Sequence, residues 1–227
     1  MFWQETKPDE NFVVPDDVVD VSFRISCRAL PVDHAWSLSQ AVCAALPWIP
    51  DEAGAGVHTI HVADSGNGWM RPEAADELLL LSKRTRLVVR IPRARCDEAT
   101  TLTGQTLDVA GHPLRIEEAT IKPLSVITTI FSRYVVSAAA DDENAFLTAM
   151  VQEMNALGVR PKKMLCGIEK QLATPDGPIR ARSLMVAELT QDESIALQRR
   201  GLGPRRHLGC GLFIPHKDIR EVKQVLD

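Results

Sequence analysis

The chain has 227 residues, of which 45% are hydrophobic and 25% charged, and its formal net charge is −4. These values are ordinary for a soluble globular protein with one large or two small domains. No apolar run approaches a membrane span and the acidic N-terminus excludes a secretory signal. The five scattered cysteines, without a C-x-x-C pair, argue against zinc and disulfides and favour a reducing cytoplasm.

The first half of the chain alternates strands and helices. Alternating β-branched and aromatic residues predict a strand over Val18–Leu30, which Pro31 ends. Asp33 is a favourable N-cap for a helix that runs to about Leu46. Further elements predicted for this half are strands at 57–63 and 86–92, a short helix at 94–102 and a strand pair at 107–121. The order is β-α-β-β-α-β.

The second half repeats this order. Asp141 or Asp142 caps a helix that ends before Gly158, and Thr190 caps another that continues to Arg200. The strands predicted here lie at 127–138, 163–174, 179–188 and 211–216. The sequence therefore predicts an α+β fold of two tandem ferredoxin-like (RRM-like, βαββαβ) domains, at residues 17–122 and 123–217.

Basic residues gather in two blocks despite the negative net charge. No acidic residue lies between Leu78 and Cys96, and none lies between Ser194 and Lys217. Two basic blocks that are distant in the sequence fit one shared phosphate-binding surface or two unrelated solvated faces.

A glycine-rich loop, residues 201–211, joins the last predicted helix to the last predicted strand. Glycine lets backbone amides turn toward a ligand and lets a phosphate approach closely, and arginine grips phosphates in a fork. Dinucleotide fingerprints and P-loops run strand, loop, helix, so this order excludes both. The loop fits either a phosphate-binding cradle or a flexible turn. Its residues of interest are Gly201, Gly203, Arg205, Arg206, His207, Gly209 and Gly211.

The loop follows the pattern Gly-apolar-Gly-x5-Gly-x-Gly directly before a strand, and it resembles the hallmark loop of the repeat-associated RNA-binding (RAMP) superfamily of CRISPR systems. Members of that superfamily are built on ferredoxin-like folds. Leu30–His34, Ser82–Leu87, Pro175–Leu184 and Leu208–His216 add to the resemblance. Together they are similar to the CRISPR-repeat-processing endoribonucleases, the sixth Cas family, and to their compact Myxococcus-type subfamily. The similarity runs from about residue 18 to residue 217.

The resemblance implies a metal-independent endoribonuclease without a cofactor. It would cut CRISPR precursor RNA within each repeat to give guide RNAs, with a 2′-hydroxyl attacking the neighbouring phosphate and leaving a cyclic phosphate. Such chemistry needs a base, an acid and positive charge around the phosphate. RNA and other CRISPR-associated subunits are the implied partners. The alternatives are a non-catalytic RNA-binding subunit of the same superfamily and a small-ligand regulator.

Histidines are the candidate proton-transfer groups. His34 lies in the first helical turn, where the helix dipole disfavours imidazolium, and we expect it to be the general base. The alternative is a structural role, in which the His34 side chain only packs over the end of the helix. His58 is the reserve catalytic candidate, and His61 is expected on the opposite face of a strand. Tyr134 is expected to be a structural residue of a core strand.

Basic side chains are the candidate phosphate ligands. The resemblance implies that Lys83 and Arg84 bring positive charge near the scissile phosphate, with Lys83 as a catalytic candidate. The alternative is that both are simply solvent-exposed side chains at the start of a strand. Arg205 and Arg206 are expected to contact the RNA backbone. His207 and the four glycines of the loop are expected to contact RNA beside them.

Overall fold

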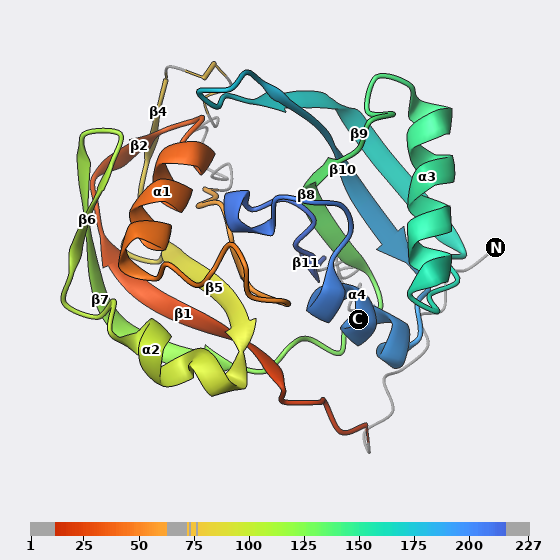
Figure 1. Cartoon of the computed structure of the whole chain (residues 1–227), viewed down its shortest axis with the longest axis horizontal. Coiled ribbons are helices and arrows are strands. Elements are labelled where there is room, and N and C mark those ends of the chain that lie inside the picture. The colour runs from red at the N-terminus through yellow and green to blue at the C-terminus, as the bar shows by residue number, and fades with distance from the viewer. Residues whose placement is uncertain (1–11, 63–71, 73, 76, 217–227) are drawn as a thin grey trace, which may run out of the picture.

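The computed structural model describes residues 12–62, 72, 74–75 and 77–216. Two β-sheets dominate it, one from each half of the chain, and the segment that follows the last helix passes between them (Figure 1).

The N-terminal sheet has five strands in the order β3-β5-β1-β7-β6. A separate two-stranded sheet pairs β2 with β4, a pairing that the sequence did not predict. The elements of this half are β1 (Val18–Ser26), β2 (Ala29–Pro31), α1 (Ala35–Ala45), β3 (Gly56–Val57), β4 (Leu78–Leu80), β5 (Arg86–Pro92), the 3-10 helix η1 (Arg93–Arg95), α2 (Cys96–Thr100), β6 (Thr106–Val109) and β7 (His112–Lys122).

The C-terminal sheet has four strands in the order β11-β8-β10-β9. Its half contains β8 (Ile130–Val136), α3 (Glu143–Ala156), β9 (Lys163–Leu172), β10 (Ile179–Ala187), α4 (Gln191–Arg200), η2 (Arg206–Leu208) and β11 (Ile214–Pro215). Within the described part of the chain, no helix has the length and apolar character needed to cross a bilayer.

The predicted α+β class is confirmed. In a ferredoxin-like β-α-β-β-α-β unit, the first strand lies between the third and the fourth strand of the sheet. Both sheets have this arrangement, because β1 lies between β5 and β7, and β8 lies between β10 and β11. The domain boundary at residues 122 and 123 stays a prediction of the sequence, and residue 217 lies outside the described residues.

Helix caps explain where the C-terminal helices begin. Asp142 Oδ1 accepts the Ala145 amide at 2.6 Å before α3, and Thr190 forms a capping box with Glu193 before α4. Both predicted caps are confirmed. The prediction for α1 is wrong, because His34 occupies the N-cap position and makes no side-chain cap.

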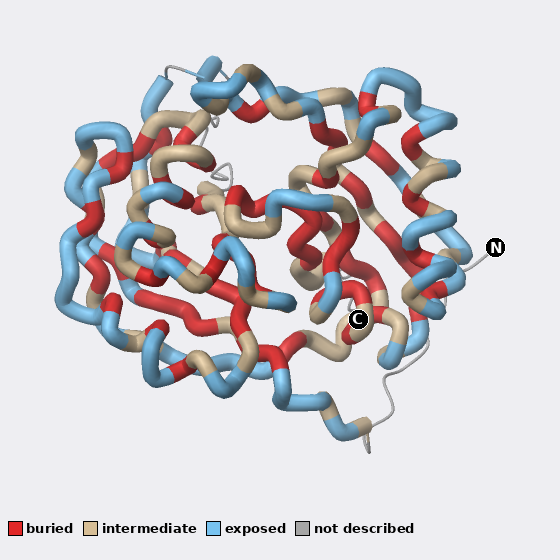
Figure 2. Tube along the Cα trace, in the orientation of Figure 1, coloured by how far each residue is buried: buried red, intermediate tan, exposed pale blue. Residues whose placement is uncertain are grey.

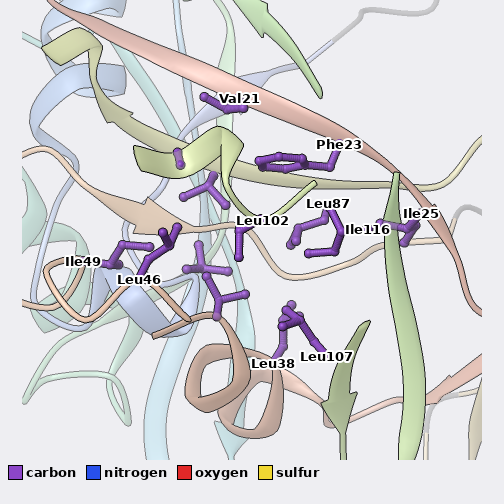
Figure 3. Packing of buried hydrophobic residues seen from close by; sticks show 14 of the residues in the cluster. Val21, Phe23, Ile25, Leu38, Leu46, Ile49, Leu87, Leu102, Leu107 and Ile116 are labelled. Carbon is purple, nitrogen blue, oxygen red and sulfur yellow. The ribbon is translucent and has the colours of Figure 1, made fainter. Parts of the chain in front are cut away.

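Each half has its own hydrophobic core on the helix-covered face of its sheet. In the N-terminal half, Phe23, Leu38, Leu87 and Leu102 interdigitate, as Figure 3 shows. The C-terminal core includes Phe146 of α3 and the other buried residues Met150, Met154, Leu184 and Phe213. Buried stretches follow the central strands of both sheets in Figure 2.

A buried arginine joins the two halves. Arg90 on β5 is 0% exposed, and its Nε and Nη2 donate to both carboxylate oxygens of Asp20 on β1 at 2.8 and 2.9 Å. Its Nη1 donates to the carbonyl oxygens of Gln198 on α4 and Phe213 before β11, at 2.9 and 2.8 Å. Burial opposes ionisation of Asp20, but the Arg90 charge outweighs it and lowers the pKa of that carboxyl below its ordinary value.

We expect Arg90→Met to lower the free energy of unfolding by about 3–5 kcal/mol, because it leaves the Asp20 carboxylate, whose side chain is only 20% exposed, without its cation. Arg24→Met is the matched control, since Arg24 lies on the same sheet with a half-exposed side chain paired to exposed Glu118, and it should cost about 1 kcal/mol or less. Urea denaturation measures both. Equal losses would contradict a special role for Arg90.

Candidate active site

A cavity of about 690 Å³, here called the His34 cavity, lies between the start of α1, the segment 59–62 and the C-terminal sheet. Both halves of the chain contribute polar side chains to it, so it exists only because the halves are packed together. These side chains are Asp33, His34, Thr59, His61, Arg133, Tyr134, Lys170, Gln171 and Ser183.

His34 is 2% exposed at the edge of this cavity, and its ring is fixed by the backbone. The Ile60 amide donates to His34 Nε2 at 3.0 Å, so Nε2 carries the lone pair. Nδ1 therefore carries the proton in the neutral ring and donates it to the Pro31 carbonyl oxygen, 2.8 Å away. The ring is a proton acceptor through Nε2, although the Ile60 amide occupies that lone pair in this structure.

A second cavity of about 390 Å³, here called the His58 cavity, is lined by Asp20, Ser22, His58 and Lys122 and by Leu212 near β11. Burial, together with the charge of nearby arginines, lowers the pKa of the His58 imidazole to about 3, so the ring is neutral at physiological pH. Within the described part of the chain, His58 Nε2 is buried without a hydrogen-bond partner.

The two cavities share Thr59, His61 and Arg133. The sequence predicted a strand over 57–63, with His58 and His61 on opposite faces. That prediction is wrong beyond Val57, where sheet pairing ends, and residue 63 lies outside the described residues. Because the segment leaves the sheet, strand alternation no longer applies and both histidines line the His58 cavity.

The amides of the four glycines in the glycine-rich loop are used inside the protein. Gly201 donates to the Leu197 carbonyl oxygen, Gly209 to that of Arg206 and Gly211 to that of Tyr134. Gly203 donates to Glu153 Oε2 at 3.0 Å. These amides therefore do not form the phosphate cradle that the sequence predicted, and we assign the four glycines to the packing of the loop.

Two of these glycines allow a close backbone approach. A Cβ on Gly211 would lie 2.0 Å from the Leu202 carbonyl oxygen. A Cβ on Gly209 would lie 2.7 Å from Thr59 Cγ2 and 3.1 Å from the Thr59 amide nitrogen. Gly209 thus lets the loop pack directly on the segment that carries His58 and His61, and Gly211 lets the loop fold closely on its own Leu202.

The basic residues of the loop differ in orientation. Arg206 donates through Nε to the Ala55 carbonyl oxygen and through Nη2 to that of Gly54, at 3.1 and 2.9 Å. Burial, with the charge of Arg90, lowers the pKa of Arg206 to about 10. Arg206 therefore ties the loop to the N-terminal half and does not present its guanidinium to RNA as predicted. Arg205 is exposed, and His207 is half-buried.

Lys83 and Arg84 are exposed in the turn between β4 and β5, and neither lines the His34 cavity or the His58 cavity. Tyr134 was expected to be structural. It does pack with Ala35 and Leu208, but it also lines the His34 cavity. Lys170 was missed by the sequence analysis; its Nζ lies 6.0 Å from the centre of the Tyr134 ring. No group of three or more His, Cys, Asp or Glu residues among those described is placed to hold a metal ion.

A family model described as Cas6, "Cas6 Crispr", matches residues 19–218. The chain belongs to the Cas6 family. It is 28% identical over 197 residues to the CRISPR-associated endonuclease Cas6 of Myxococcus xanthus (strain DK1622). The aligned region covers 87% of this chain and 81% of the relative. The resemblance drawn from the sequence is confirmed.

Solved structures of Cas6 proteins share the fold. A CRISPR associated protein Cas6 superposes with a TM-score of 0.56 at 9% identity, over 88% of this chain and 100% of that chain. A Cas6-related protein from Pyrococcus furiosus gives 0.55 at 13% identity, over 90% and 99%. At these identities the likeness concerns the fold alone.

We expect Gly209→Ala to destabilise the protein by about 3 kcal/mol or more, because the added methyl group meets Thr59 and the backbone must shift. Gly104→Ala is the matched control. Gly104 has φ +86°, close to the +83° of Gly209, but open space at its Cβ, so it carries only the cost of left-handed backbone, about 1–2 kcal/mol. Thermal or urea unfolding compares the two variants, and similar losses would argue against tight loop packing.

Proposed function

We propose that this chain is an endoribonuclease that cuts CRISPR precursor RNA within its repeats and so yields guide RNAs in the cytoplasm. The similarity to the CRISPR-associated endonuclease Cas6 of Myxococcus xanthus supports this activity. The observation that carries the proposal is the His34 cavity, which gathers two imidazoles and two cationic side chains from both halves: His34, His61, Arg133 and Lys170. Imidazoles move protons near neutral pH, and cations attract a phosphate.

The proposed reaction is attack of a ribose 2′-hydroxyl on the adjacent phosphate. The new bond joins the 2′-oxygen to phosphorus, the bond to the 5′-oxygen breaks, and the products are a cyclic phosphate and a 5′-hydroxyl. His34 Nε2 accepts the hydroxyl proton in this proposal, in the tautomer that the Pro31 carbonyl oxygen stabilises. The hydroxyl must replace the Ile60 amide at that nitrogen, so binding of RNA moves the 59–62 segment.

Exposed basic residues supply RNA affinity outside the cavity. Arg205, Lys83 and Arg84 are exposed and lie outside both cavities. We assign them to contacts with the RNA backbone, which weaken with salt. His207 is half-buried beside Arg205, and burial and that arginine lower its pKa. We assign it to RNA contact as well. Further CRISPR-associated subunits are proposed partners that hold the product.

The purified chain, incubated with repeat RNA in excess EDTA, should cut each repeat once and leave a 2′,3′-cyclic phosphate. Denaturing gels and mass spectrometry of the products test this. RNA with a 2′-deoxyribose before the cut is the control and should stay intact, because it has no attacking hydroxyl. Tight binding without any cut would favour the alternative function, a non-catalytic RNA-binding subunit.

His34→Ala should slow single-turnover cleavage by on the order of 10²–10⁴ while RNA affinity stays close to wild type. His58→Gln is the comparison, because His58 is already neutral and lines only the His58 cavity; it should cleave at nearly the normal rate. Quench-flow or gel assays at saturating protein give both rates. If His58→Gln is the slower variant, the base is His58 and not His34.

A further inference from the structure

The C-terminal sheet carries two β-bulges at one position. Arg182 on β10 pairs with Val135 and Glu169, whereas Leu184 pairs with Ser132 and Cys166. Ser183 between them therefore faces two residues on each neighbouring strand. On β8 these residues are Arg133 and Tyr134, and on β9 they are Gly167 and Ile168.

A bulge turns consecutive side chains away from strict alternation and so re-aims them. Here Arg133, Tyr134, Gly167, Ile168 and Ser183 all line the His34 cavity. Gly167 leaves room for this geometry, because a Cβ there would lie 2.4 Å from Ser183 Oγ. The double bulge thus builds the cavity wall that faces His34.

Tyr134 is held rigidly in that wall. Its carbonyl oxygen accepts the Gly211 amide at 2.6 Å, which fixes β8 to the glycine-rich loop. Its ring packs beside Ala35 of α1, next to His34 in the chain, and beside Leu208. Lys170 crosses from β9 and places Nζ 6.0 Å from the ring centre. A phenol and an ammonium group therefore lie together in the cavity that His34 borders.

We propose that Tyr134 and Lys170 complete the reaction centre from the C-terminal sheet: the Tyr134 hydroxyl protonates the leaving 5′-oxygen and the Lys170 ammonium stabilises the charge on the phosphate. This rests on the proposed ribonuclease function. Tyrosine is protonated at neutral pH and can donate, whereas His34 is held as an acceptor. Arginine keeps its proton, so Arg133 cannot serve as the acid.

The proton balance closes within the site. The 2′-hydroxyl proton passes to His34 as the bond from oxygen to phosphorus forms. The Tyr134 proton passes to the 5′-oxygen as its bond to phosphorus breaks. The resulting phenolate lies near the Lys170 ammonium and regains a proton from His34 through solvent, so no outside reactant is consumed.

The test uses the full chain and two repeat RNAs, one normal and one with sulfur in place of the leaving 5′-oxygen. A thiolate leaves without protonation, so an acid matters only for the oxygen substrate. Tyr134→Phe should cleave the normal RNA about 100-fold more slowly and the sulfur RNA at close to the wild-type rate. Lys170→Met should be slow on both RNAs, because the phosphate charge is the same, and Lys162→Met, an exposed lysine outside the cavities, should be normal.

Other results separate the hypotheses. If the wild type cuts neither RNA, the proposed function itself fails. A wild type that cuts while Tyr134→Phe is normal, or is slowed equally on both RNAs, overturns the assignment of Tyr134. If His61→Gln is the only variant that is slow on the normal RNA but cleaves the sulfur RNA at the wild-type rate, His61 is the acid. A Lys170→Met variant that cleaves normally overturns the role of Lys170.

Discussion

The arrangement of the whole molecule depends on one buried guanidinium. Arg90 projects from the face of the N-terminal sheet that its own helices do not cover, and the C-terminal half closes over it. A buried cation is tolerated only with a carboxylate and with acceptors for its remaining protons. Asp20 supplies the carboxylate, and the carbonyl oxygens of Gln198 and Phe213 accept the remaining protons. Because Arg90 needs these acceptors, it holds α4 and the segment just before β11 against the N-terminal sheet.

The glycine-rich loop forms the second connection between the halves. It follows α4, so the Arg90 contacts set its starting point, and Arg206 then ties it to the carbonyl oxygens before β3. Gly209 lets the loop pack on Thr59, and the Gly211 amide donates to the Tyr134 carbonyl oxygen of β8. The loop thus holds the segment with the histidines against the wall that carries the tyrosine, and the His34 cavity, which both halves line, keeps its geometry.

Local signals in the sequence predicted the fold well. Asp142 and Thr190 are caps that act within one turn of their own helix, and both were found from the sequence. The family motif also directed attention to the loop. Its glycines were predicted to bind phosphate. The conformational freedom of glycine, however, suits contact with a ligand and a tight contact inside the protein equally well. Only the partners of their amides separate the two uses.

The features that the sequence could not reveal depend on contacts between distant residues. His58 and His61 face the same cavity because pairing stops at Val57, which no local pattern records. Tyr134 reaches the cavity through a bulge, and a bulge is a mismatch of register between strands. The N-cap of α1 was misassigned because Asp33 instead accepts the Ala173 amide from the other half.

The central claim is that the reacting phosphate lies between the two halves, with His34 on one side and Tyr134 and Lys170 on the other. A crystal structure with uncut repeat RNA, made inert by a 2′-deoxyribose at the cleavage position, tests it most directly. We predict that the phosphate lies in the His34 cavity, within hydrogen-bond reach of Lys170, with the 5′-oxygen near the Tyr134 hydroxyl. A phosphate on the outer surface of the glycine-rich loop, away from all three side chains, would contradict the account.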